Sequence, residues 1–85
     1  MRAITCAQLI RLLLLDGWVV RRKAPHGLLL LKRFPGEAFP RNTTVPDKGS
    51  QIIVGSTLGA ILGVKQTSLG QDGLEVLIRR FGLNS

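Results

Sequence analysis

The first apolar residues of the chain repeat at helical spacing. Three leucines fall on one face of residues 6–15, which predicts an amphipathic helix with that face in the core. They are Leu9, Leu12 and Leu13. Thr5 and Gln8 have the spacing of a capping box, in which each side chain bonds the other residue's backbone N–H. Asp16-Gly17 should end this helix, because glycine readily adopts the left-handed conformation found at helix C-termini.

The middle of the chain alternates between strand-forming runs and turn residues. Aliphatic, β-branched and aromatic residues predict three strands, at residues 18–23, 28–33 and 41–45. The turn residues 24–27 predict a hairpin between the first two strands, and 34–40 predict a second turn region. Pro46 should stop the third strand, and residues 52–54 read as a short extended piece. Trp18, at the start of the first strand, is expected in the core.

Two more helices are predicted in the last third of the chain. The first starts with Ser56 or Thr57 as its N-cap and ends near Lys65. The second starts at residues 68–71, which have capping-box spacing, and runs to about Phe81. Gly82 follows as a C-cap, and two arginines in the last turn suit the helix dipole.

The order of these elements predicts the fold class. Consecutive strands with helices at both ends indicate an α+β sandwich, in which a three-stranded antiparallel sheet carries the helices on one face. The last helix is an accessory to this α-β-β-β-α order. With 85 residues, the chain is expected to form one domain over residues 1–85.

The second predicted strand contains four consecutive leucines: Leu28, Leu29, Leu30 and Leu31. Side chains alternate between the two faces of a strand, so one pair must point away from the helices. We expect that outward pair to form a protein interface, either in a homo-oligomer or with another partner. The alternative is that it packs under the loop 34–40 or the C-terminal helix.

The charge of the chain is strongly basic and unevenly placed. Twelve Lys and Arg against five Asp and Glu give a net charge of +7. Seven of these cations lie in the middle of the chain: Arg21, Arg22, Lys23, Lys32, Arg33, Arg41 and Lys48. Such a cluster favours a polyanionic partner and predicts an RNA- or phosphate-binding surface. The alternative is a solvated strand face that keeps the sheet soluble. With four aromatic residues, binding through phosphates is expected rather than base stacking.

The remaining composition limits the class of protein. Cys6 is the only cysteine, so no intrachain disulfide can form and a reducing, cytoplasmic location is expected. One cysteine and one histidine cannot supply the four ligands of a structural zinc site, so no metal is expected. No run of apolar residues reaches the ~18 needed to span a bilayer, and neither a membrane association nor a signal peptide is expected.

His26 is the one residue that points to catalysis. It is the only histidine and lies in the predicted hairpin turn between two basic runs. An imidazole titrates near neutral pH, so it can exchange a proton with a reacting group, and neighbouring cations can hold a phosphodiester. The alternative is a histidine that is merely exposed in a turn. The five carboxylates form no convincing constellation for metal or acid–base chemistry.

Several short motifs together resemble the HicA-type (YcfA-like) mRNA interferase toxins. The resemblance is carried by Asp16-Gly17-Trp18 after the first helix, the basic strand before His26, Thr44-Val45-Pro46, and Gly55-Ser56-Thr57-Leu58 with Ile61-Leu62. It covers residues 4–69. It implies a fold like the double-stranded-RNA-binding domain. It also implies a type II toxin with endoribonuclease (hydrolase) activity that uses His26 as its catalytic residue and needs no cofactor. Such a toxin is inhibited by a HicB-type antitoxin.

One departure from that family suggests other functions. The family carries a small Gly-Ser pair before its histidine, whereas this chain has Ala24-Pro25. Proline removes a backbone donor and restricts the residue before it. The hypotheses are therefore an active ribonuclease, a catalytically inactive RNA-binding module of the same fold, and a module kept for its contact with an antitoxin.

Overall fold

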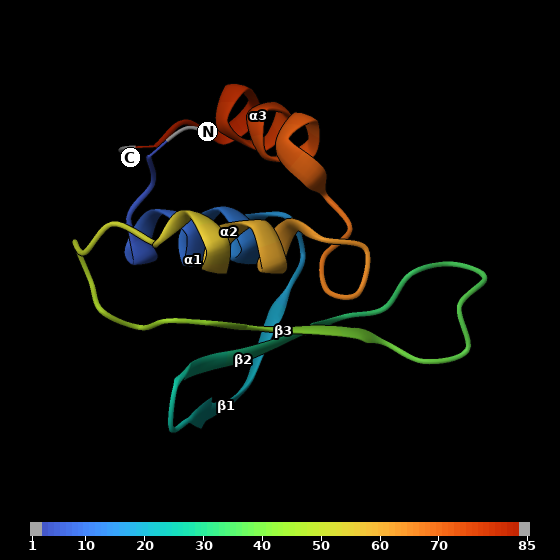
Figure 1. Ribbon diagram of the computed structural model, residues 1–85. Helices are drawn as coiled ribbons and strands as arrows, with labels where there is room; N and C mark the ends of the chain where they lie inside the picture. The colour runs from blue at the N-terminus through green and yellow to red at the C-terminus, as the bar shows by residue number, and fades with distance from the viewer. Residues whose placement is uncertain (1–2, 84–85) are drawn as a thin grey trace.

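A computed structural model describes residues 3–83 of the chain. The elements are α1 (Cys6–Leu15), β1 (Val19–Ala24), β2 (Gly27–Lys32), β3 (Arg41–Val45), α2 (Gly55–Leu62) and α3 (Gly70–Phe81). The strands form one antiparallel sheet in the order β1-β2-β3. In Figure 1, α1 and α2 lie between the sheet and α3. The fold is therefore α+β with all three helices on one side of the sheet, as predicted, and the first two strands lie within one residue of their predicted positions.

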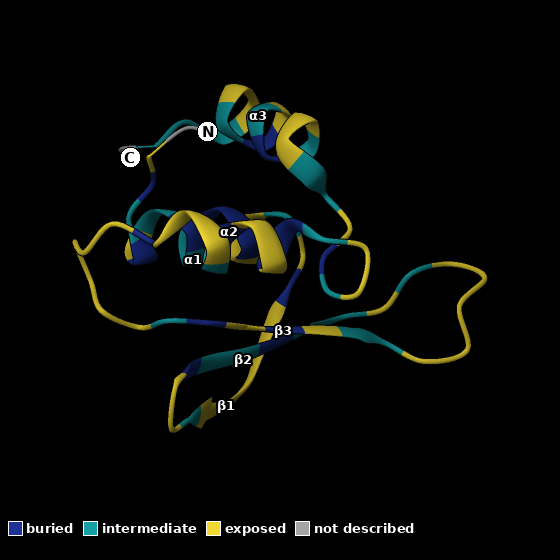
Figure 2. Ribbon diagram, viewed as in Figure 1, coloured by how far each residue is buried: buried dark blue, intermediate teal, exposed yellow. Residues whose placement is uncertain are grey.

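The hydrophobic core lies between the sheet and the helices, as the dark blue segments of Figure 2 show. The predicted helix face is buried, with Leu9, Leu12 and Leu13 all at zero exposure. Trp18 is 1% exposed, which confirms its predicted place in the core. α3 adds Leu74 to the core and packs on α1 and α2, so it does not cover the sheet. Within residues 3–83, no helix has both the length and the apolar character that crossing a bilayer requires.

The start of α1 confirms the predicted capping box. The backbone N–H of Gln8 donates to Thr5 Oγ1 at 3.1 Å, and the backbone N–H of Thr5 donates to Gln8 Oε1 at 2.9 Å. The segment 52–54 is extended, as predicted, and runs beside this helix start. Ile53 N–H donates to Ile4 O at 2.9 Å, and Thr5 and Ile52 form an antiparallel bridge.

Thr5→Ala should lower the free energy of unfolding by about 1 kcal/mol, because it leaves the first turn of α1 without its side-chain acceptor. Urea denaturation followed by circular dichroism would measure the change. Ser56→Ala is the matched control, since Ser56 is exposed and α2 has no side-chain cap bond. That control should change stability by less than about 0.5 kcal/mol. Equal losses in the two variants would contradict the role of the cap.

The predicted limits of α2 are wrong at both ends. Val54 is its N-cap, not Ser56 or Thr57, and no side chain in the described range 3–83 caps the helix. The helix ends at Leu62 rather than near Lys65. The chain turns back at this point because Thr67 bonds Ile61 O twice, through its N–H at 3.0 Å and its Oγ1 at 2.7 Å.

The predicted capping box at residues 68–71 is also wrong. Leu69 is the N-cap of α3; its side chain makes no capping bond, and its N–H donates to Thr67 Oγ1 at 3.3 Å. Ser68 has a φ of 59°, in the left-handed region, and its N–H bonds Gly63 O at 2.8 Å. The α2–α3 loop is thus fixed by local backbone bonds, which override the spacing of the polar residues. The end of α3 at Phe81 and the Gly82 C-cap, with φ 76°, are as predicted.

Candidate functional site

The β1–β2 hairpin turn presents His26 at the surface. Ala24 pairs with Gly27 across the hairpin, so the turn consists of two residues, Pro25 and His26. His26 is exposed. Pro25 fixes its own φ, and the flanking pair closes the turn, so the backbone that carries the imidazole is held on both sides.

Gly27 brings this turn against the end of β3. Its φ is +147°, and a Cβ at this position would collide with Val45 O and lie 2.9 Å from Pro46 Cα. Only glycine permits this approach, because it has no side chain. The register agrees, since Leu28 pairs with Val45. The residues that follow β3 therefore lie beside His26, although twenty positions separate them along the chain.

A hollow of about 290 Å³ forms between the turn and the segment after β3. Its lining comes from both: Lys23, Ala24, Pro25, His26, Gly27, Pro46, Asp47 and Lys48. Two lysines, one imidazole and one carboxylate thus share a small open site. Within residues 3–83, neither lysine nor His26 makes a side-chain hydrogen bond or ion pair, so these groups are available to a ligand. Such a site can bind a phosphate and exchange a proton with it.

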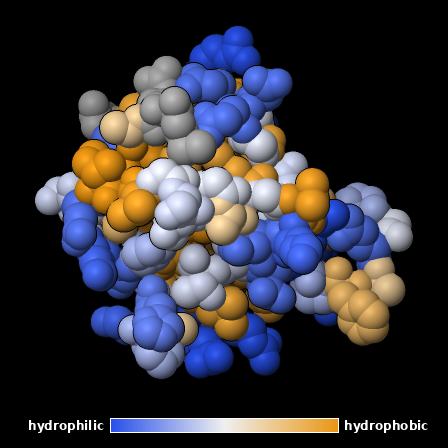
Figure 3. Space-filling model, in the orientation of Figure 1, coloured by the Kyte–Doolittle hydropathy of each residue, from blue (hydrophilic) through white to orange (hydrophobic). Residues whose placement is uncertain are grey.

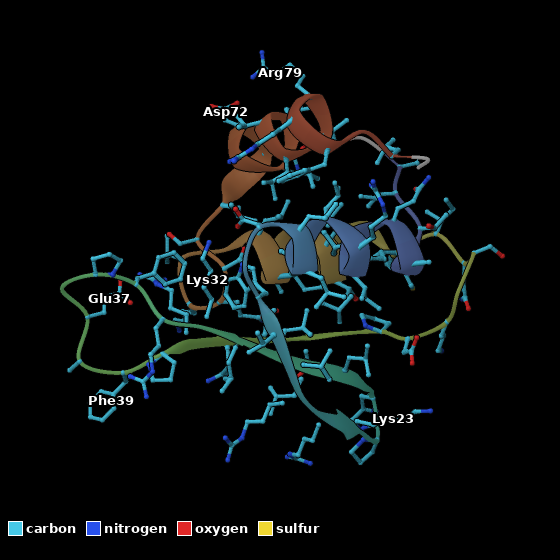
Figure 4. The ribbon with its side chains drawn as sticks, turned by 180° about the vertical axis from the view of Figure 1, so that it is seen from behind. Lys23, Lys32, Glu37, Phe39, Asp72 and Arg79 are labelled. Carbon is cyan, nitrogen blue, oxygen red and sulfur yellow. The ribbon has the colours of Figure 1, made fainter. Side chains whose placement is uncertain are left out.

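The structure divides the predicted basic surface into three parts. Lys23 and Lys48 line the hollow with His26. Two other cations, Arg21 and Arg22, are exposed on β1. Arg33 is exposed directly after the end of β2. Lys32 and Arg41 are bound within the protein, and Figure 4 places Lys32 at the opposite end of the sheet from Lys23. The seven cations therefore do not form one continuous phosphate-binding surface.

Lys32 connects the end of α1 to the sheet. Its Nζ donates to Asp16 O at 2.6 Å and to Asp16 Oδ2 at 3.3 Å. The same ammonium lies 5.1 Å from the centre of the Phe34 ring. These contacts assign Lys32 a structural role, and its role in phosphate binding stays a prediction. Sequence distance hid the pair, because sixteen positions separate the two partners.

Arg41 has a similar structural role. Its guanidinium pairs with Glu37, with Nη2 3.0 Å from Oε2. It also donates to Val64 O at 2.9 Å, and its Cζ lies 5.6 Å from the centre of the Phe34 ring. These bonds hold the start of β3 against the α2–α3 loop. Arg41 therefore has a structural role as well, and its role in phosphate binding also stays a prediction.

The four leucines divide as strand alternation requires. Leu30 is completely buried and Leu28 packs against the core, so neither can form the predicted partner interface. Leu29 and Leu31 point to the other face of the sheet and are half-buried. That face is away from α3, so the C-terminal helix does not cover this pair.

Asp47 lines the hollow with a carboxylate, and the sequence did not predict it as a site residue. The signal was available in the Val45-Pro46 pair, because a strand that ends beside the hairpin turn delivers its next residues to that turn. Within residues 3–83, no three His, Cys, Asp or Glu side chains are grouped closely enough to hold a metal ion.

Comparison with known proteins gave no match to any family model, curated protein or solved structure. The assignment of function therefore depends on the geometry of the hollow and on the motifs of the chain.

Proposed function

We propose that this protein is an endoribonuclease of the HicA type that cleaves mRNA at the His26 hollow. The observation that carries the proposal is one exposed imidazole that lines the same hollow as two unpaired lysines, one from β1 and one from the loop after β3. The resemblance in motifs supports it, as does the observed order of one helix, three antiparallel strands and a second helix. That order is compatible with a fold like the double-stranded-RNA-binding domain.

The proposed chemistry assigns one role to each group in the hollow. Lys23 and Lys48 bind the scissile phosphodiester and stabilise the charge that builds up on its oxygens. His26 removes the proton from the 2′-hydroxyl, whose oxygen then attacks phosphorus. The bond from phosphorus to the 5′-oxygen breaks, and that oxygen takes a proton from water. All groups come from this chain, so the proposal includes no cofactor.

The family resemblance extends the proposal to a partner and a location. A toxin of this type acts on cytoplasmic mRNA and is held inactive by a HicB-type antitoxin. In this chain the hollow is open to solvent and its cations are unpaired, so a protein that covered it would also block RNA.

Pro25 supports a second candidate function, an RNA-binding module that does not cleave. This residue lines the hollow where the family has a small residue with a backbone donor. The lysines would still hold a phosphate, but the missing N–H removes one group that could position it. The same inactive module could be retained for antitoxin binding.

Replacing His26 with alanine should abolish cleavage and leave RNA binding intact. The expected loss of rate is at least about 100-fold, the usual contribution of a general base. Growth after induction, with transcripts mapped by primer extension, would compare wild type and His26→Ala in cells. Purified proteins and a labelled RNA would give the rate and the affinity.

Lysine variants separate binding from chemistry. Lys23→Ala and Lys48→Ala should each weaken RNA binding and reduce its salt dependence. Lys65→Ala is the charge-matched control, because this exposed lysine lies in the α2–α3 loop, away from the hollow. RNA binding without cleavage by folded wild type would replace the ribonuclease with the binding module. Equal effects of all three lysine variants would overturn the site.

A further inference from the structure

β1 is an edge strand with apolar side chains exposed on both of its faces. The sheet order is β1-β2-β3, and within residues 3–83 no strand pairs with the other side of β1. Val19 is 59% exposed and Val20 is 47% exposed. Figure 2 shows this exposure as the yellow start of the strand. An edge of this kind is a template for pairing with another extended chain.

A groove of about 380 Å³ lies over the paired ends of β1 and β2, on the face away from the helices, and reaches Pro40. Its apolar lining includes Val19, Leu31 and Pro40, and its cationic lining includes Arg21 and Arg33. Within residues 3–83, neither arginine makes a hydrogen bond or an ion pair. On the face drawn in Figure 3, hydrophilic side chains predominate at the lower end of the molecule, where the β1–β2 hairpin lies.

We infer that β1 docks an extended, acidic segment of another protein, which adds to the sheet as a fourth strand. The backbone of such a segment would pair with the open edge of β1, and its apolar side chains would cover Val19 and Leu31. Its carboxylates would pair with Arg21 and Arg33, which present guanidinium groups suited to bidentate bonds. Main-chain pairing would supply affinity, and the charge pattern would select the partner.

A second copy of this chain fits the same edge poorly. Two β1 strands paired about a two-fold axis would bring Arg21, Arg22 and Lys23 of both copies together across the seam. Each copy also carries a net charge of +7. Like charges placed directly opposite on paired strands are destabilising. Charge complementarity therefore selects an acidic segment over the homo-oligomer that the leucine pattern allowed.

RNA is also a poor match for this edge. Its phosphates would pair with the arginines, but it has no peptide groups to bond the edge of β1 and would leave the valine side chains uncovered. The groove and the His26 hollow have no lining residue in common. The inference therefore stands independently of the proposed cleavage activity.

The probe is a fluorescein-labelled, eight-residue peptide, Val-Thr-Glu-Thr-Val-Thr-Glu-Thr, which presents valine and glutamate on the same face of an extended strand. It is titrated with the full chain and followed by fluorescence anisotropy. Wild type and His26→Ala should bind it equally well. Arg21→Glu should weaken binding about tenfold or more, the equivalent of one charge-assisted hydrogen bond. Val19→Thr should also weaken binding, because it places a hydroxyl in the apolar contact. Val64→Thr and Arg79→Glu are the matched controls, because both residues are exposed outside the sheet, and they should leave binding unchanged.

Main-chain pairing has its own control. The same peptide with every second nitrogen methylated cannot donate along one edge, so it should bind at least about tenfold more weakly. Equal binding of the methylated peptide would show simple charge attraction and overturn strand addition. A wild-type dimer in sedimentation that Val19→Thr dissociates would assign the edge to a second copy instead.

Discussion

Gly27→Ala should be the most damaging single-methyl change in this protein. The new Cβ would collide with the carbonyl of Val45, and the backbone φ of +147° is strained for any side chain. Overpacking costs about 1–3 kcal/mol and a strained backbone conformation about the same again, so we expect a loss of about 3 kcal/mol or more. Domains of this size have only about 4–13 kcal/mol of stability in total. Urea denaturation would measure the loss.

The matched control is Gly49→Ala, at another glycine of positive φ. Gly49 has a φ of +57°, and a Cβ there would meet no atom within 4 Å. Its substitution should therefore cost only the backbone term, about 1–2 kcal/mol. A Gly27 variant no less stable than the Gly49 variant would show that the hairpin turn does not lie against β3. The hollow at His26 would then lose its geometric basis as well.

Trp18→Ala should be the most damaging core substitution, with a loss of about 3–5 kcal/mol. The indole is 1% exposed and meets the Phe34 ring edge-to-face, with ring centres 6.1 Å apart. Phe34 in turn lies under the cations of Lys32 and Arg41. Removing the indole would leave a large cavity and release the aromatic ring that both cations contact.

Trp18→Phe should cost at least about 1 kcal/mol less than Trp18→Ala, for a reason specific to this site. The Trp18 Nε1–H is buried and finds no acceptor among residues 3–83, so phenylalanine breaks no hydrogen bond. A buried donor without a partner is itself destabilising, by about 1–3 kcal/mol. Removing it offsets part of the lost packing. Thermal and urea unfolding of both variants would test this, and equal losses would show that the indole N–H is bonded in solution.

Periodicity predicted the parts of this fold that bury side chains. The leucine spacing in residues 6–15 predicted α1 with its buried face, and the alternation of strands and turns predicted the three strands and the first hairpin. These predictions succeeded because side-chain burial repeats with the period of each element. The single domain over residues 1–85, the function and the functional residues remain predictions.

The helix starts near Ser56 and Ser68 could not be predicted in the same way. A serine before an apolar run has the composition of a cap, but the cap forms only if the chain enters the helix at that residue. At α3 the entry is set by the left-handed Ser68 and by the bond of its N–H to Gly63 O. At α2 it is set by the burial of Leu58 and Ile61, which fixes the phase of the helix.

Most residues of the candidate site were predicted from the sequence. Which of them lie close together was predicted only in part. His26 and Lys23 are three positions apart, so their proximity follows from the hairpin. Lys48 belongs with them only because β3 pairs beside β2, which local patterns do not reveal. Lys32 bonds Asp16, sixteen positions away, and Arg41 bonds Val64 O in addition to the nearby Glu37. The two distant partners could not be read from the sequence. Charge counts cannot distinguish a free cation from one already bonded inside the protein.

The sheet, the pair α1 and α2, and α3 form three successive layers. This order determines which part of the molecule can detach without disturbing the rest. α3 packs mainly on α1 and α2, on the side away from the sheet. Detachment of α3 would expose Leu74 and Leu77 while leaving every strand pairing in place. Partial opening of this kind needs less free energy than global unfolding, so we expect α3 to open as a separate cooperative unit. The hairpin with His26, at the other end of the stack, would keep its geometry through these excursions.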